Sequence, residues 1–195
     1  MRAISFAATA ALALTGCIDS GPTRISYVTV ENAYRYNEFA TAASPGELRI
    51  VIVGDPFSVG RERFDEAVIE AMDGHHFGPP VEFTTAAEAH VSPHHTVVMM
   101  FDAPISTSEV ALCQTSPSAG QPATATTQPA PSPDQPVYVM AAFCQDGQTL
   151  TYLGGVMARS GLDDPRFRDF VGQVTMQLFP IRNPDAEHDG NIVFP

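Results

Sequence analysis

The chain of 195 residues contains no lysine, and all ten of its basic residues are arginines. Apart from Arg2, the arginines are scattered from Arg24 to Arg182, and the formal net charge is -12. Binding to nucleic acid requires clustered positive charge that neutralises phosphates. We therefore expect no nucleic-acid partner. So acidic a surface also opposes electrostatic docking on anionic lipid.

Long apolar runs are also scarce. The uncharged stretch 3–16 follows the single positive charge of Arg2, and it is shorter than the about 20 residues that a helix needs to cross a bilayer. Its length and its end in small residues are typical of a secretory signal peptide. A buried core helix is the alternative.

The last residues of this stretch are Leu14, Thr15 and Gly16, and Cys17 follows them. This tetrapeptide resembles the lipobox of bacterial lipoproteins, in which a branched apolar residue and two small residues precede the cysteine that receives lipid. The resemblance implies that 1–16 is a signal peptide, that it is removed and that Cys17 is acylated, so that the N-terminal lipid binds the protein to a membrane. Ile18 occupies the position where an enterobacterial inner-membrane lipoprotein carries aspartate. The resemblance therefore favours the outer membrane, on the face toward the periplasm.

Two further cysteines, Cys113 and Cys144, complete the total of three. In an oxidising compartment such a pair predicts a disulfide, and two free buried thiols are the alternative. Segment 115–136 between them consists almost wholly of Pro, Ala, Thr, Ser, Gln and Gly. We interpret it as a disordered insert in a connection between two strands, which the disulfide would hold together. A proline-rich ligand or a glycan acceptor is its functional alternative.

Hydrophobic periodicity predicts strands at 47–53, 95–104, 137–144 and 149–158, with a turn at Asp146 and Gly147, and a less clear strand at 25–31. Amphipathic helices are expected at 61–72, capped by Ser58, and at 163–179, capped by Asp163 or Asp164. These elements indicate an α+β fold: a two-layer sandwich with a mainly antiparallel sheet of about four or five strands and two amphipathic helices. The predicted organisation is a lipid-anchored tether at 17–46, a domain at 47–180 and an irregular tail at 181–195. The order of the elements resembles that of small proteobacterial envelope lipoproteins, a resemblance that assigns no functional residues.

Histidines are the most suggestive side chains for chemistry. The candidates for a metal site form two groups, one of His75 and His76 and one of His90, His94 and His95. His90 and His94 have the i, i+4 spacing of a helical metal site, but Pro93 between them breaks a helix. We expect histidines in solvated loops, and a zinc or copper site is the alternative.

The sequence contains none of the common motifs for a serine nucleophile, a zinc protease or a phosphate-binding loop. We therefore expect no catalytic residues, no cofactor and no enzymatic activity. The leading hypothesis is a lipid-anchored, non-catalytic protein that binds an envelope protein or glycan or supports envelope assembly. A periplasmic metal-binding protein and a hydrolase with an unrecognised site are the alternatives.

Overall fold

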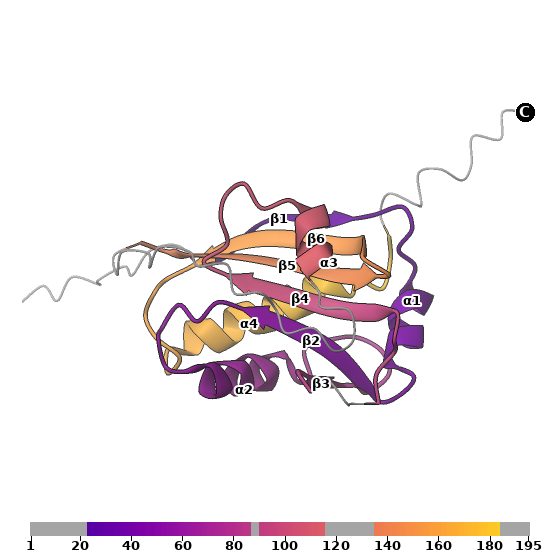
Figure 1. Ribbon diagram of the computed structural model, residues 1–195, viewed down its shortest axis with the longest axis horizontal. Helices are drawn as coiled ribbons and strands as arrows, with labels where there is room; N and C mark the ends of the chain where they lie inside the picture. The colour runs from indigo at the N-terminus through magenta and orange to yellow at the C-terminus, as the bar shows by residue number, and fades with distance from the viewer. Residues whose placement is uncertain (1–22, 87–89, 116–134, 184–195) are drawn as a thin grey trace, which may run out of the picture.

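The computed structural model describes residues 23–86, 90–115 and 135–183. Within these ranges the fold is α+β, as predicted, with one mixed sheet (Figure 1). The sheet has six strands in the order β1-β6-β5-β4-β2-β3. Their bounds are Arg24–Val30 for β1, Glu47–Val53 for β2, Glu82–Thr84 for β3, His95–Phe101 for β4, Val137–Gln145 for β5 and Gln148–Met157 for β6.

The sheet is larger and less antiparallel than predicted. β1, β6, β5 and β4 pair antiparallel, whereas β2 pairs parallel with both β4 and β3. β2 and β4 are parallel because the connection between them, which includes α2, returns the chain to the end of the sheet at which β2 starts. β3 has only three residues, too few to show an alternating pattern in the sequence.

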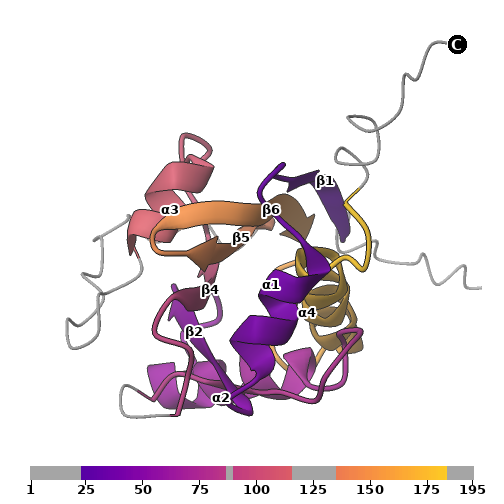
Figure 2. The same ribbon diagram turned by 90° about the vertical axis from the view of Figure 1, so that its right-hand side faces the viewer.

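In the part of the chain that the structure describes, four helices cover the sheet, where the sequence predicted two. They are α1 (Tyr36–Ala43), α2 (Arg61–Met72), α3 (Glu109–Thr115) and α4 (Pro165–Leu178). α1, α2 and α4 pack on one face, and α3 lies alone on the other (Figures 1 and 2). The predicted two-layer sandwich is therefore the larger part of the fold, and α3 adds a partial third layer.

The main core lies between the sheet and helices α1, α2 and α4. Its largest side chains are aromatic, and Phe39, Phe64, Phe143, Phe170 and Phe179 are fully buried. Each such side chain stabilises the fold by about 1.5–3 kcal/mol. A smaller core between α3 and the opposite sheet face contains Leu112 and Val98.

The folded unit begins earlier than the predicted boundary at residue 47. β1 pairs with β6 along its length, and the buried Tyr34 donates a hydrogen bond to the carbonyl of Pro180 at 2.8 Å. The buried Asn183 amide donates to the carbonyl of Glu31 at 2.8 Å. Much of the predicted tether 17–46 and the first residues of the predicted tail 181–195 therefore belong to the domain, because strand pairing and core packing hold them. The rest of the tail, segment 1–22 and most of the predicted insert 115–136 lie outside the described residues.

The hairpin of β5 and β6 is confirmed. Its turn consists of Asp146 and Gly147, whose φ angles of 50° and 78° are those of a tight hairpin turn. Gly154 and Gly155 of β6 are paired in register with β5. Opposite them on β1, the register shifts between Ile25 and Tyr27. The two glycines provide room for neighbouring aromatic rings.

The predicted caps differ between the two long helices. Asp164 caps α4 by accepting a hydrogen bond from the backbone N–H of Arg166, as expected. Ser58 does not cap α2, because Gly60 occupies the N-cap position. Instead the carboxylate of Asp55 accepts hydrogen bonds from the backbone N–H groups of Phe57 and Gly60 and fixes the loop ahead of α2.

Candidate functional site

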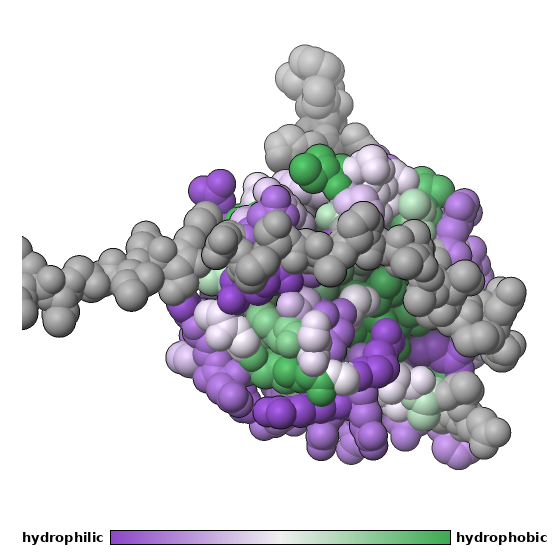
Figure 3. Space-filling model, turned by 60° about the vertical axis from the view of Figure 1, so that its left-hand side comes forward, coloured by the Kyte–Doolittle hydropathy of each residue, from purple (hydrophilic) through white to green (hydrophobic). Residues whose placement is uncertain are grey.

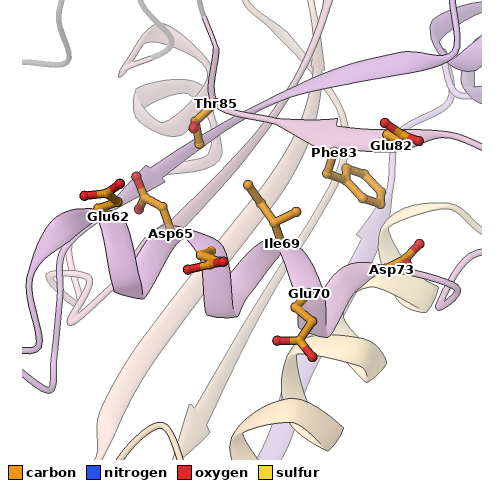
Figure 4. Close-up of a pocket in the computed structure, with 9 residues that line it drawn as sticks. Glu62, Asp65, Ile69, Glu70, Asp73, Glu82, Phe83 and Thr85 are labelled. Carbon is orange, nitrogen blue, oxygen red and sulfur yellow. The ribbon is translucent and has the colours of Figure 1, made fainter.

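An acidic groove of about 640 Å³ runs between α2 and β3 (Figure 4). The helical repeat of α2 brings its acidic residues to one side of the groove, and β3 forms the other side. The side chains of Ile69 and Phe83 give the groove its apolar part. The other lining residues are Glu62, Asp65, Glu66, Glu70, Asp73, Glu82 and Thr85.

Asp65 is the least solvated carboxylate of this groove. Its Oδ2 accepts a hydrogen bond from Arg61 Nε at 2.7 Å, and its Oδ1 is buried without a hydrogen-bond partner in the described structure. Burial raises the pKa of the Asp65 carboxyl, and the hydrogen bond from Arg61 acts in the opposite direction. Glu70 at the groove's rim pairs with Arg168 of α4 at 2.6 Å, with both side chains exposed. The groove is thus a strongly negative surface whose carboxylates are in part already paired.

An arginine and an aspartate meet at the end of the sheet where β2 and β4 finish. The Arg159 guanidinium forms a two-pronged ion pair with the Asp102 carboxylate, and their side chains are only 10% and 16% exposed. Arg159 also donates hydrogen bonds to the carbonyls of Pro56 at 2.8 Å and Gln135 at 3.0 Å. The Arg159 side chain, which follows β6, therefore connects the ends of β2, β4, β5 and β6. A shallow hollow of about 460 Å³ beside it is lined in part by Phe57, Arg63 and Leu162.

His95 stands at the start of β4 and is buried. Its ring stacks on Phe143 with ring centroids 5.6 Å apart, and its Nδ1 lies 2.8 Å from Ser92 Oγ. Its Nε2 lies 3.5 Å from Glu38 Oε2, too far for a strong hydrogen bond. Burial lowers the pKa of the His95 imidazole, and Glu38 opposes that effect in part.

A serine, a histidine and a glutamate in this spatial order resemble the catalytic triad of a hydrolase. We therefore ask whether Ser92 could be the nucleophile of the hydrolase alternative. Two features oppose a nucleophilic role. Ser92 and His95 are only 8% and 2% exposed, so a substrate has no direct access to the hydroxyl. The next residue is Pro93, which lacks the backbone N–H that commonly stabilises the oxyanion. Ser92 instead provides a hydrogen-bond partner for a buried imidazole.

The remaining candidate histidines occupy separate environments. The His76 ring lies edge-on between Phe39 and Phe83, with centroids 5.4 and 5.9 Å away. His75 packs against α4 at Gly172, and exposed His94 pairs with Asp146 at 2.8 Å.

His90 is exposed, and in the described residues no group of three or more His, Cys, Asp or Glu is arranged to hold a metal ion. The expectation of solvated loop histidines is wrong for His95, which lies in the core because β4 begins there, and for His76, whose ring packs between two phenylalanines. The five histidines supply no common ligand set for the metal-binding alternative.

Cys113 and Cys144 form a disulfide in the structure, with Cα atoms 5.6 Å apart. Cys113 lies on α3 and Cys144 on β5, so the bond joins a helix to the sheet and not two strands, as the sequence had led us to expect. Thr149 Oγ1 lies 3.3 Å from the Cys113 sulfur and donates to the carbonyl of Glu109. Cys17, the predicted lipidation site, lies outside the described residues.

Comparisons with known proteins give no match to a family model, to a curated protein or to a solved structure. In the ranges that the structure describes, no helix combines the length and the apolar character needed to cross a membrane. The candidate sites thus rest on the geometry and the sequence of this chain alone.

Proposed function

We propose that this protein is a non-catalytic lipoprotein of the cell envelope, held by acyl chains on Cys17 at the periplasmic face of the outer membrane. Its α+β domain binds an envelope protein or glycan or supports envelope assembly there. The observation that carries the proposal is the use of the three cysteines. Cys113 and Cys144 bond to each other, which leaves Cys17, directly after Leu14, Thr15 and Gly16, as the cysteine available for lipid.

The physical chemistry of anchoring supports this assignment. A single acyl chain gives only marginal membrane binding, whereas two or more chains on one cysteine give stable attachment. A disulfide persists in an oxidising compartment and is rare in the cytoplasm, so an intramolecular disulfide agrees with export. The same compartment would be reached through a signal peptide at 1–16.

The non-catalytic part of the proposal rests on how the reactive side chains are used. His95 Nδ1 and Ser92 Oγ lie within hydrogen-bond distance of each other inside the core. The Arg159 and Asp102 pair holds strand ends together. These groups serve the fold, and a binding role requires none of them to react.

Metabolic labelling with a palmitate analogue tests the anchor. The wild-type protein is expected to incorporate label and to sediment with membranes, and Cys17→Ala is expected to lose both. Cys113→Ala with Cys144→Ala is the matched control, because it removes the other two cysteines and is expected to retain the label. Equal labelling of Cys17→Ala and wild type would refute the proposal.

Crosslinking in living cells followed by purification tests the partner. The expected result is an envelope protein or a cell-wall glycan that is absent when Cys17→Ala prevents membrane attachment. If no such partner is captured and deletion of the gene leaves envelope integrity unchanged, the binding and assembly role is wrong.

A further inference from the structure

The anchor and the folded domain are separated by very little chain. Six residue steps lead from Cys17 to Thr23, and six extended residues span about 20 Å at most. Thr23 is already fixed to the domain, because its Oγ1 accepts a hydrogen bond from the backbone N–H of Ala158 at 3.3 Å. An acylated Cys17 would therefore hold this end of the sheet close to the bilayer surface.

The strands that meet at this end present a row of side chains on one face. Arg24 of β1 pairs with Val156 of β6, and Val156 pairs with Tyr138 of β5. Cross-strand partners project from the same side of a sheet. Val139, the neighbour of Tyr138, is buried in the main core, so the row lies on the opposite face, the one that carries α3.

A second row lies directly behind the first on the same face. Tyr27 of β1 pairs with Gly154, and the row continues through Met140 and Met100 to Val53. The Tyr27 ring covers Gly154, where an added Cβ would lie 2.5 Å from the ring. Met140 in this row is buried, and it packs with Met100 and Val53 in the smaller core under α3. The part that remains outside that core consists of the first row and Tyr27, and we call it the open sheet face.

α3 leaves this face uncovered because it packs toward the other end of the strands. Its disulfide partner Cys144 and its neighbour Thr149 are next to the β5–β6 turn, whereas Thr23 contacts the far end of β6. Tyr27 and Tyr138 are exposed, and Ile105, in the turn just after β4, is 88% exposed. Figure 3 brings this end of the molecule forward and shows hydrophobic residues among hydrophilic ones.

The chemistry of the open sheet face fits the interface of a bilayer. Tyrosine is enriched at the level of lipid headgroups, where its ring is apolar and its hydroxyl remains solvated, and arginine extends its charge toward water. The chain has 22 acidic residues, but none of them belongs to either row. The two rows themselves therefore carry no negative charge, and the acidic side chain that acts on Tyr27 is Glu109 of α3, which adds to the effect of burial in raising the pKa of the Tyr27 hydroxyl.

We propose that the open sheet face lies on the same phospholipid surface that holds the acyl chains of Cys17, with Tyr27, Tyr138 and Ile105 at headgroup level. This inference depends on the proposed function for the anchor and adds the orientation of the domain. It places α2 and the acidic groove on the side away from the membrane, because they pack against the other face of the sheet.

A fluorescence experiment tests the orientation, and the chain is well suited to it because it contains no tryptophan. Single-tryptophan variants Tyr138→Trp, Ile105→Trp and Phe77→Trp are prepared as full-length mature protein on phosphatidylethanolamine and phosphatidylglycerol vesicles that contain brominated lipid. Phe77 is 55% exposed, and it lies beside Gly78, which packs on α1 at the opposite end of the sheet. It is the matched control.

Tyr138→Trp and Ile105→Trp are expected to lose emission to brominated lipid, because both tryptophans would lie at headgroup level. Phe77→Trp is expected to keep its emission. Ile105→Trp reads the same surface without altering packing if Tyr138→Trp fails to fold. Equal quenching of all three, or quenching of Phe77→Trp alone, would overturn the proposal.

Failure of the anchor and failure of the orientation can be told apart. Mass spectrometry of the N-terminal peptide shows whether Cys17 is acylated in cells. Coupling Cys17 to a maleimide lipid on the vesicle then gives the same short attachment chemically. If the tryptophans at positions 138 and 105 are quenched in the coupled protein, the proposed orientation is supported even where Cys17 is not acylated in cells. If they are not quenched in the coupled protein, the orientation is wrong.

Discussion

Replacing Arg159 with methionine is expected to lower the free energy of unfolding by about 3–5 kcal/mol, the usual cost of breaking a buried ion pair from one side. Methionine retains the apolar stem but removes the charge, so the mostly buried Asp102 carboxylate loses its ion pair with Arg159. The carbonyls of Pro56 and Gln135 also lose a donor. Since small domains have only about 5–15 kcal/mol of stability, this one change removes a large fraction.

Two further variants separate the ion pair from the loss of packing. Asp102→Asn keeps a residue that tolerates the φ angle of 53° at this position, and the double variant is expected to recover about 1 kcal/mol or more relative to the sum of the single changes. Arg168→Met is the matched control. It breaks the exposed pair with Glu70 and is expected to cost less than about 1 kcal/mol, because solvent screens exposed pairs.

Urea unfolding at neutral pH measures all four variants in a Cys17→Ser background, with the disulfide intact. A loss for Arg159→Met below about 1 kcal/mol, or one equal to that of Arg168→Met, would refute the view that Arg159 joins the strand ends.

Other predictions concern glycine, histidine and the disulfide. Gly155→Ala is expected to destabilise the domain by about 1–3 kcal/mol, because its Cβ would lie 2.8 Å from a backbone carbonyl and 2.9 Å from the Phe170 ring. Gly154→Ala is expected to cost less, because its Cβ would meet the tyrosine ring of Tyr27, which can move. Thermal unfolding measures both variants, and a larger loss for Gly154→Ala would contradict this reasoning. Burial lowers the pKa values of His95 and His76 below 6.5, so the unfolded chain binds protons first as the pH falls through 6.5, and the free energy of unfolding is expected to decrease with acidification below that pH. His95→Gln should flatten this dependence in urea titrations between about pH 7.5 and 5.5, and an unchanged slope would count against it. Reducing the disulfide is expected to lower the urea midpoint by an amount equivalent to about 2–4 kcal/mol, and an unchanged midpoint would show that α3 does not depend on the bond.

Elements with a clear hydrophobic period could be predicted from the sequence. The alternation in β2, the continuous apolar run of β4 and the stripe of α4 all produced the expected elements near the expected bounds. The hairpin was readable from its Asp-Gly turn, because this dipeptide tolerates the positive φ angles that a tight turn requires.

The missed elements carry little periodic signal. α1 has only eight residues and no side-chain cap at its N-terminus, and α3 has only seven residues. Both are held by tertiary contacts: Phe39 packs on Phe179 at a centroid distance of 4.3 Å, and Cys113 bonds to β5. The sequence of each helix itself does not indicate which distant residues it contacts.

The same limit applies to the candidate sites. Arg159 and Asp102 are 57 residues apart in the sequence, and nothing in either neighbourhood predicts that they meet. The histidines illustrate the reverse case, because their closeness in sequence suggested a common site. The structure separates them, since His95 faces the core from β4 while His94 pairs with Asp146 at the surface.

Intact-mass analysis of the protein purified from membranes with mild detergent tests the central claim most directly. The account predicts a mature chain that begins at Cys17 and carries the added mass of a diacylglyceryl group on that cysteine, with Cys113 and Cys144 oxidised. A chain that retains 1–16, or one in which Cys17 carries no lipid, would contradict it.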